Sequence, residues 1–328
     1  MASITLPARS KSHEHLRPLN ILRDLPGVAD LIELCFSNTM DNEGRSYVQQ
    51  MRNAGRDDFF LKWANKMADS ASLPMTGFVW EENGKIIGNS SLVPFKYRGK
   101  KIYLIANVAT HPDYRRRGIA RALTEAAIYH ARQKKADTVW LHVRDDNPGA
   151  ARLYEELGFR ERARRTTWQA STDPLLPEPE TDIDITTRQP RFWHQQRQWL
   201  EMLHPDELAW HRNWNWNSLE PGLWNWLYRL LVEFELQQWA ALKNGNLQAV
   251  LAWAPASGRY GDSLWAAMKP DGDETALKVL LMNARRRLRH RRALTFEYPA
   301  GQAVEAIQSA GFHAQRTLIW MRLAGATS

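Results

Sequence analysis

Apolar residues recur in the middle of the first half with two different spacings. Between Gly118 and about Lys134 they return every three or four positions and would share one helical face, through Ile119, Leu123, Ala127 and Ala131. Two flanking runs, 102–110 and 138–143, are rich in apolar and β-branched residues and have the length of strands. A helix between two such strands is typical of a fold that mixes α and β elements.

The remaining segments extend this pattern. Asn83-Gly84 separates two strand-like runs and is a strong signal for a tight hairpin turn. The other predicted elements are strands near 16–20, 78–80, 85–93 and 164–169, and helices over about 25–37, 45–68 and 148–157. Early hairpins and a helix between later strands predict an α/β fold with a mixed sheet, of the α+β kind.

A proline-rich segment divides the chain. Residues 171–181 contain three prolines and three acidic residues, and no apolar period continues through them. A chain of 328 residues is long enough for two domains, each with its own core. We therefore expect a first domain over residues 1–170, a linker over 171–181 and a second domain over 182–328.

The second half repeats features of the first. Asn244-Gly245 lies 161 residues after Asn83-Gly84, and Gly311 lies 153 residues after Gly158, each closing a helix-like segment. These offsets indicate a duplicated fold with small deletions. The polar positions are not repeated, because Ile307 stands where Tyr154 would recur and the segment 268–274 is acidic. The second copy is therefore predicted to be degenerate.

Composition limits the setting in which the protein works. Cys35 is the only cysteine, which excludes an intrachain disulfide and fits a reducing compartment. Residues 1–20 contain no apolar run typical of a signal peptide, and no stretch approaches the length of a membrane-spanning helix. We expect a cytoplasmic protein with no membrane partner. No zinc-finger spacing or aromatic–basic RNA signature is present, so no nucleic-acid partner is expected either.

The net charge of +8 belongs to the first half. Residues 1–170 contain 27 Lys and Arg against 19 Asp and Glu, whereas residues 171–328 contain 17 of each. A basic half is suited to attracting a ligand that carries phosphate groups. A merely solvated basic surface is the alternative, and composition does not decide between the two.

The loop that precedes the predicted helix 118–134 has phosphate-binding chemistry. The sequence Arg115-Arg116-Arg117-Gly118-Ile119-Ala120 follows a strand and opens the helix. A helix start offers unpaired backbone N–H groups and the positive end of the helix dipole, and small residues let the backbone approach a phosphate closely. With only Arg115, Gly118 and Ala120 as fixed positions, this motif is weak by itself.

A second motif follows the first along the chain. Leu141-His142-Val143-Arg144 precedes Asn147-Pro148, a pair suited to starting a helix, and that helix carries Tyr154 and ends at Gly158-Phe159. Together the two motifs resemble the Gcn5-related N-acetyltransferase (GNAT) family over about residues 15–170. Within that family they are similar to the ribosomal-protein alanine N-acetyltransferase subgroup.

The resemblance implies two tandem acyl-CoA N-acyltransferase folds, acetyl-CoA as the acyl donor and no metal. In the family the pyrophosphate of coenzyme A lies on the basic loop, and the preceding strand pairs with the pantetheine arm. Carried onto this chain, the implied cofactor-binding positions are Val108, Ala109, Thr110, Arg115, Arg116, Arg117, Gly118, Ile119, Ala120 and Asn147. Arg116 and Arg117 could instead face water, and Asn147 could serve only as a helix cap.

The resemblance also implies two catalytic residues. In the family a tyrosine at the position of Tyr154 donates a proton to the departing thiolate, which a phenol with a pKa of about 10 can do. His142 stands where the subgroup commonly has a glutamate base, and an imidazole with a pKa of about 6.5 could accept the proton of the amine. A packing tyrosine and a strand histidine satisfied by a neighbour are the alternatives.

We therefore expect an N-acetyltransferase that moves an acetyl group from acetyl-CoA to a primary amine by direct attack in a ternary complex. A protein or peptide N-terminal acetyltransferase and a non-catalytic acyl-CoA-binding or interaction protein are the alternatives. In the family the segment that joins the first two helices often lines the acceptor site. Here this is the segment 37–44, where Asp41 or Glu43 could hold an ammonium group, and a solvated loop is the favoured alternative. The substitution of histidine for the subgroup's glutamate leaves the acceptor amine open.

Overall fold

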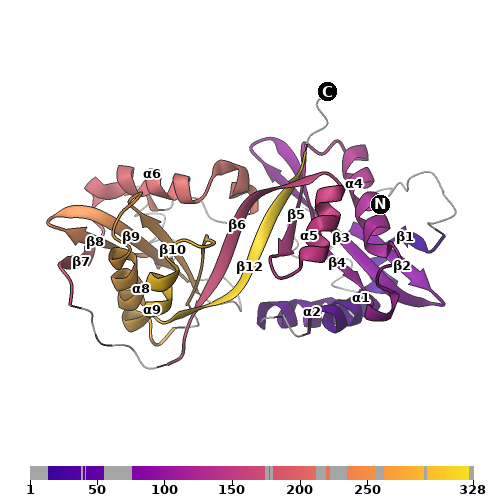
Figure 1. Ribbon diagram of the computed structural model, residues 1–328, viewed down its shortest axis with the longest axis horizontal. Helices are drawn as coiled ribbons and strands as arrows, with labels where there is room; N and C mark the ends of the chain where they lie inside the picture. Colours follow the sequence, from indigo (N-terminus) through magenta and orange to yellow (C-terminus); the bar gives the residue numbers. More distant parts are fainter. Residues whose placement is uncertain are drawn as a thin grey trace. The chain divides into compact units, whose positions relative to one another are not determined.

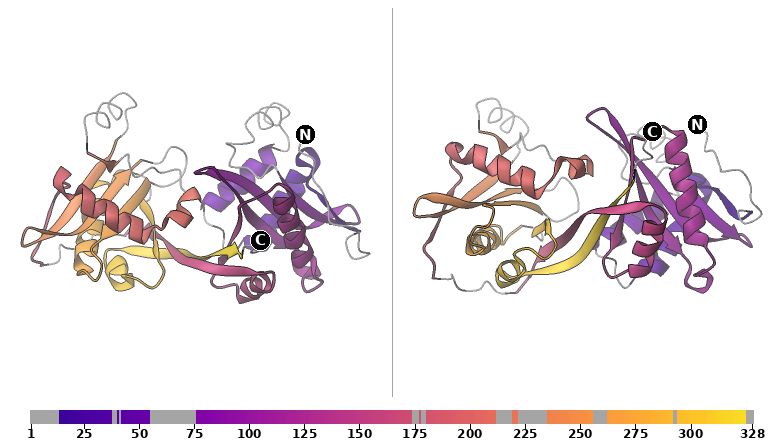
Figure 2. Two further views of the ribbon diagram at one scale, coloured as in Figure 1. Left: turned by 90° about the horizontal axis from the view of Figure 1, so that it is seen from above. Right: turned by 45° about the horizontal axis from the view of Figure 1, so that its top comes forward.

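The structure is a computed structural model that describes residues 14–37, 40, 42–54, 76–173, 177, 180–211, 219–221, 235–255, 262–291 and 294–324. It forms two compact units, one made of Met1–Ala163 with Ile319–Ser328 and the other of Arg164–Leu318. Two long strands, β6 (Phe159–Ala170) and β12 (Phe312–Leu323), lie side by side and are each divided between the units (Figures 1 and 2).

This division differs from the boundaries expected from the proline-rich segment. Residues 171–181 fall inside the second unit, and the end of β12 belongs to the first. Pairing between strands that lie about 150 residues apart leaves no local signal in the sequence, whereas a run of prolines is conspicuous.

The sheet of the first unit has the order β1-β2-β3-β4-β5-β12-β6. Neighbouring strands from β1 to β4 are antiparallel, whereas β5 is parallel to β4. The parallel pair needs a crossover, which α4 (Ile119–Gln133) provides. The bounds of the strands are β1 Leu16–Pro18, β2 Thr76–Glu82, β3 Lys85–Tyr97, β4 Lys100–Thr110 and β5 Thr138–Arg144.

Helices cover both faces of this sheet (Figure 1). α1 (Ile21–Phe36) and α2 (Asn42–Ala54) form one core with Val79, and α4 and α5 (Pro148–Glu156) form another with Phe78. Phe78 and Val79 are neighbours in β2, so their side chains point to opposite faces. Among the described helices, none combines the length and the apolarity needed to cross a membrane.

Two helices differ from their predicted bounds. α1 begins at Ile21 rather than near residue 25, because the side chain of Asn20 caps it by accepting a hydrogen bond from the N–H of Leu22 at 3.1 Å. Pro26, which is typical of a first turn, lies in the second turn of this helix. The helix predicted over 45–68 is α2 as far as Ala54, and residues 55–75 lie outside the described part of the chain.

The second unit repeats the fold of the first. Its sheet has the order β7-β8-β9-β10-β11-β6-β12, with β8 and β9 joined at Asn244-Gly245 as β2 and β3 are joined at Asn83-Gly84. All four turn residues have positive φ, between 51° and 76°, as this kind of hairpin turn requires. The predicted tandem pair of mixed α/β folds is confirmed.

The bounds in the second unit are as follows: strands β7 Ile183–Thr187, β8 Gln237–Lys243, β9 Asn246–Ala254, β10 Asp262–Met268 and β11 Leu294–Pro299; α-helices α6 Trp193–Leu203, α8 Thr275–Arg287 and α9 Val304–Ser309; short 3₁₀ helices Pro190–Phe192 and Asp206–His211. Its largest core joins the inner sides of β9, β10 and β11 to α8 and α9.

Candidate active site

The parallel strands β4 and β5 stop pairing part of the way along. Their ladder runs from Ile102 opposite Thr138 to Ile105 opposite Leu141, although β4 continues to Thr110 and β5 to Arg144. Ala109 and Thr110 remain paired with β3 on the other edge of β4. Beyond Ile105 the edge of β4 that faces β5 is therefore open to pair with something other than β5.

A bulge in β4 begins where the ladder ends. Asn107 has φ of 51°, and the register against β3 shifts by one residue between Asn89 and Ser91. The fully buried Asn89 donates from Nδ2 to the carbonyl oxygen of Asn107 at 2.8 Å, and Asn107 donates from its own Nδ2 to the hydroxyl oxygen of Tyr47 on α2 at 2.8 Å. These three side chains hold the bulge, and no sequence motif points to Asn89 or Tyr47.

The loop after β4 leads into the N-terminus of α4. Residues 112–114 form a short 3₁₀ turn, and the backbone of Arg116 and Gly118 then takes positive φ values of 64° and 78°. A β-carbon placed on Gly118 would meet nothing within 4 Å, so the backbone is open on that side. Alternating backbone signs of this kind turn successive N–H groups toward one point, next to the positive end of the helix dipole. The loop thus has the geometry of an anion site.

The three loop arginines have different surroundings. Arg117 pairs with Glu82 at 2.8 Å and lies over the ring of Tyr114, with 5.1 Å between Cζ and the ring centroid. Arg115 and Arg116 are exposed in the loop. Arg117 is thus engaged with the protein itself, whereas Arg115 and Arg116 leave positive charge at the loop surface.

Cys35 attaches α1 to the end of β4. Its thiol donates to the carbonyl oxygen of Thr110 at 3.3 Å. Burial raises the pKa of this thiol, and the nearby guanidinium of Arg115 opposes that rise only in part. The thiol is thus a hydrogen-bond donor at neutral pH, and it links α1 to the strand end that leads into the loop.

Tyr154 lies on α5 among the core residues of the α4/α5 face. It is 6% exposed and meets Phe159 edge-on, with ring centroids 6.2 Å apart. Burial raises the pKa of its phenol above the usual range, so the phenol is protonated at neutral pH. Asn147 starts this helix, because its Oδ1 accepts from the N–H of Ala150 at 3.1 Å. The expected cap is therefore present.

His142 is the first residue of β5 beyond the last pair of the ladder. Its neighbours Leu141 and Val143 belong to the core under α4 and α5, so His142 points to the opposite face. There its ring lies 4.0 Å from that of Trp320, centroid to centroid, at an angle of 41°. Trp320 is on β12, more than 170 residues along the chain, so no local pattern connects the two residues.

The two expected catalytic residues thus lie on either side of one sheet: Tyr154 shares a core with Ile105 and Leu141, whereas His142 points to the opposite face. The structure describes only part of the segment 37–44: Asp41 and the side chain of Glu43 lie outside the described residues. Within the described residues, no group of three His, Cys, Asp or Glu side chains could hold a metal ion.

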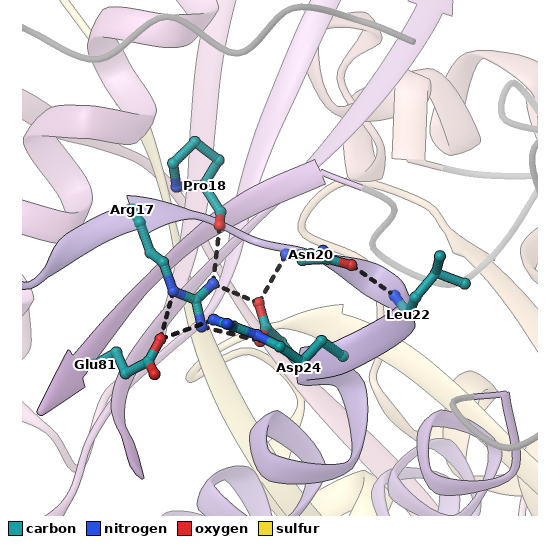
Figure 3. Close-up of polar contacts among 7 residues, drawn as sticks. Arg17, Pro18, Asn20, Leu22, Asp24 and Glu81 are labelled. Atoms are coloured by element: carbon teal, nitrogen blue, oxygen red, sulfur yellow. Dashed lines mark hydrogen bonds and ion pairs between the residues drawn. The ribbon is translucent and has the colours of Figure 1, made fainter. Parts of the chain in front are cut away.

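A cavity of about 670 Å³ lies elsewhere in the first unit, between α1 and the β2–β3 turn. Its polar wall is a closed network (Figure 3): Arg17 donates to both carboxylate oxygens of Asp24 at 2.6 and 2.9 Å, to Glu81 at 2.6 Å and to the carbonyl oxygen of Pro18 at 3.1 Å. Arg23 joins Asp24 to Glu81 from the outer side. These groups hydrogen-bond to one another, and the network therefore holds α1 against the sheet.

The loop of the second unit that corresponds to the basic loop has the opposite charge. Asp273 accepts a hydrogen bond from the N–H of Thr275 at the start of α8, at 2.9 Å, and its carboxylate also lies 3.6 Å from Nζ of Lys243. A carboxylate of the chain thus already occupies the helix N-terminus. Ile307, the counterpart of Tyr154, is fully buried in the core and has no polar group.

Comparison with known proteins agrees with this geometry. The fold and the site combine two diverging strands with a basic helix N-terminus that has the geometry of an anion site. Residues 39–159 match the model of the acetyltransferase (GNAT) family. The family resemblance found in the sequence motifs is confirmed.

Individual relatives match shorter segments. The chain is 43% identical over 67 residues to a [ribosomal protein bS18]-alanine N-acetyltransferase of Escherichia coli, which is 20% of this chain and 45% of the relative. It is 30% identical over 112 residues to a mycothiol acetyltransferase of Saccharomonospora viridis, which is 34% of this chain and 35% of the relative. The chain therefore spans less than half the length of these curated relatives.

The likeness in fold extends over nearly the whole chain. A solved structure of a GCN5-related N-acetyltransferase from Sphaerobacter thermophilus superposes with a TM-score of 0.57 at 16% identity. The superposition covers 97% of this chain and 96% of that one. At this identity the comparison concerns the fold alone, and it includes both units.

Proposed function

We propose that the first unit is an N-acetyltransferase that transfers an acetyl group from acetyl-CoA to a primary amine. The observation that carries the proposal is the end of the β4–β5 ladder at Ile105 and Leu141, which lies next to an open basic helix N-terminus and a buried phenol. The second unit keeps the fold but has Ile307 and an acidic loop at these places, and we propose that it is not catalytic.

The residues of the first unit fit the acyl donor. Backbone N–H groups at Gly118, Ile119 and Ala120, with Arg115 and Arg116, would hold its pyrophosphate. The open edge of β4 over Val108, Ala109 and Thr110 would pair with its extended arm. Asn147 uses one lone pair of Oδ1 for the helix cap, and its amide nitrogen would be available to the donor. When bound, acetyl-CoA supplies the acetyl thioester.

Two side chains would handle the protons of the reaction. The carbon–nitrogen bond forms as the carbon–sulfur bond breaks, so the amine must lose a proton and the sulfur must gain one. Tyr154 holds a proton at neutral pH, because burial raises its pKa, and would donate it to the sulfur. His142 lies on the opposite face and would accept the proton of the amine directly or through water.

Replacement of Tyr154 tests this assignment. Tyr154→Phe should lower the rate of thiol release from acetyl-CoA, measured with a panel of primary amines, by about 10²–10⁴-fold while leaving acetyl-CoA affinity nearly unchanged. Tyr129→Phe on α4 is the matched control and should change neither. Unchanged turnover in Tyr154→Phe would contradict the proposed role.

Calorimetric titration of acetyl-CoA tests whether only the first unit binds it. We expect one site per chain. Two sites would contradict the proposal for the second unit, and no binding at millimolar acetyl-CoA would overturn the enzyme proposal. Binding without turnover of any amine or peptide would favour a non-catalytic acyl-CoA-binding protein.

A peptide or protein N-terminus is the second candidate acceptor. It is supported by the 43% identity over 67 residues to an enzyme named [ribosomal protein bS18]-alanine N-acetyltransferase. Incubation with acetyl-CoA and a short peptide that begins with alanine should then add the mass of one acetyl group, whereas an N-terminally blocked peptide should gain none. The single cysteine fits our proposal that this reaction takes place in the cytoplasm.

A further inference from the structure

A basic patch lies at the opposite end of β4 from the phosphate-binding loop. It combines the β3–β4 hairpin, residues 96–101, with the end of α4 and the turn that follows, residues 132–137. These segments contain seven basic residues and a single acidic one, Asp137. The seven are Lys96, Arg98, Lys100, Lys101, Arg132, Lys134 and Lys135, and five of them are exposed, Lys101 and Lys134 being half-buried.

Direct contacts show that the two segments form one surface. Nζ of Lys101 donates to the carbonyl oxygen of Lys134 at 2.8 Å, and the backbone of Lys101 exchanges hydrogen bonds with Asp137, both at 2.7–2.8 Å. Across the hairpin, Lys96 lies opposite Lys101 and Tyr97 lies opposite Lys100. The hairpin tip and the helix end are therefore joined at Lys101.

The charge of this surface is not balanced within its two segments. Like charges directly opposite one another in a sheet are destabilising, and Lys96 and Lys101 form such a pair. The carboxylate of Asp137 accepts a hydrogen bond from the backbone of Lys101. Burial, with a contribution from Lys134 and Lys101, lowers the pKa of the neighbouring His130, so this histidine is neutral at pH 7. An anionic partner would relieve the repulsion.

This patch is separate from the proposed acetyl-CoA site. β4 contains eleven residues between Lys100 at the hairpin and Thr110 at the loop, which corresponds to roughly 33 Å of strand. The donor phosphates at Arg115 and Arg116 would thus lie at the other end of the strand. The excess positive charge of the first half therefore has a second location that binding of acetyl-CoA does not explain.

By contrast, the longest basic run of the sequence, residues 285–292, makes contacts within the second unit. Arg285 is buried and donates to the carbonyl oxygens of Ala310, Ser171 and Asp173 at 3.0–3.1 Å, and Arg291 pairs with Glu235. The run of arginines is thus easily seen in the sequence, although Arg285 and Arg291 bind groups of the second unit. The basic patch is formed by two short segments that are separate in the sequence.

We propose that the basic patch binds the phosphate backbone of a nucleic acid. Lysines spread over a hairpin and a helix end suit a chain of phosphates, and Arg98 lies over the ring of Tyr97, with 5.3 Å between Cζ and the centroid, as a planar pair on which a base can stack. An anionic membrane fits less well, because the large apolar side chains exposed among the described residues are Leu22, Leu34 and Met202, all outside the patch.

This proposal departs from the expectation that no nucleic acid is bound. That expectation rested on the lack of a linear motif in the sequence. The two segments of the patch lie about thirty residues apart and contain no such motif, and only the folding of α4 back along β4 brings them together.

The test is binding of a fluorescein-labelled, 20-nucleotide single-stranded RNA, followed by anisotropy at 50, 100 and 200 mM KCl. The patch variant carries Lys96→Gln, Lys100→Gln and Lys135→Gln, which leaves the structural Lys101 in place. If these lysines contact phosphates, the slope of log K against log[salt] should become shallower by about 2–3, and the affinity at 100 mM should fall about tenfold or more.

A charge-matched control separates the patch from net charge. The control variant carries Lys85→Gln, Lys269→Gln and Arg289→Gln, three exposed residues outside the patch, and should bind RNA like the wild type. Thermal melting and thiol release should be unchanged in both variants. Equal losses in the two variants, or no saturable RNA binding by the wild type at 50 mM KCl, would overturn the proposal. Loss of binding to vesicles containing phosphatidylserine or to polyglutamate, with RNA binding retained, would also overturn it.

Discussion

The two loops that precede α4 and α8 show how one fold can keep or lose an anion site. In the first unit the helix N-terminus is preceded by Arg115 and Arg116, both exposed, and by Gly118 with its positive φ. In the second unit Asp273 already accepts a hydrogen bond at that place and lies beside Lys243. The backbone dipole favours an anion in both, so the side chains decide whether the anion is a ligand or part of the chain.

The units also differ in where their carboxylates are held. In the first unit Arg17 and Arg23 hold Asp24 and Glu81 at the junction of β1, α1 and β2, and Glu82 of β2 pairs with Arg117 of the basic loop. In the second unit, acidic side chains lie on the loop itself.

Removal of the charge of Asp24 should have the largest effect. Asp24 is 2% exposed, and Asp24→Asn leaves the guanidinium of Arg17 without its bidentate partner, so the free energy of unfolding at pH 7 should fall by about 3 kcal/mol or more. Asp30→Asn on the same helix is the control, because its exposed pair with Arg52 should contribute less than about 1 kcal/mol. Urea denaturation measures both.

The same carboxylate should make the free energy of unfolding depend on pH in a defined direction. Burial raises the pKa of Asp24, but the hydrogen bonds from Arg17, the N–H of Asn20 and Arg23 outweigh burial and lower the pKa below its usual value. The stabilisation is thus fully present above the unfolded pKa of about 4 and is lost as pH falls through the lower, folded pKa. Asp24→Asn should flatten the acid side of the stability curve, and an unchanged acid side would contradict the assignment.

The loop arginines should differ from each other in acetyl-CoA binding. Arg116→Gln should weaken binding about tenfold or more, because an ionic hydrogen bond to phosphate contributes about 1.5–3 kcal/mol. Arg117→Gln should have a clearly smaller effect, since Arg117 already pairs with Glu82 and lies over Tyr114. Titration calorimetry compares the two variants directly. Equal losses would mean that Arg117 leaves Glu82 when the donor binds.

Local signals explain which parts of this site could be predicted. The turn at Asn83-Gly84, the cap at Asn147 and the helix exit at Gly158 act within a few residues, so their elements were found close to the observed bounds. The basic loop and the tyrosine helix follow from short motifs for the same reason.

The unpredicted parts depend on contacts between distant segments. Trp320 reaches His142 only because the last strand returns to the first unit, and Asn89 and Tyr47 hold the bulge at Asn107 from two other elements. The engagement of Arg117 by Glu82 likewise needs the β2–β3 hairpin to lie beside the loop. None of these pairs has a spacing that a sequence pattern could reveal.

Replacement of Asp273 tests whether its carboxylate alone keeps the second loop from binding an anion. Asp273→Ala removes the acceptor for the N–H of Thr275 and should lower the free energy of unfolding by about 0.5–2 kcal/mol, as the loss of a helix cap does. The variant should still bind one acetyl-CoA per chain, because the second loop, residues 268–274, contains no arginine. A second site in calorimetry would show instead that one carboxylate had blocked a working loop.

The smallest effect is expected at Lys243, which lies 3.1 Å from Asp182 and 3.6 Å from Asp273. Its hydrogen bond with Asp182 raises the pKa of its ammonium group, but the group is exposed to solvent, which screens the attraction. Lys243→Gln should therefore lower the free energy of unfolding less than Asp273→Ala does, and by still less in 0.5 M salt. A double-mutant cycle with Asp182→Asn in urea isolates the pair. A coupling as large as the loss in Asp24→Asn would mean that the second loop is held by charge as firmly as α1 is held by Asp24, and the contrast between the two units would not hold.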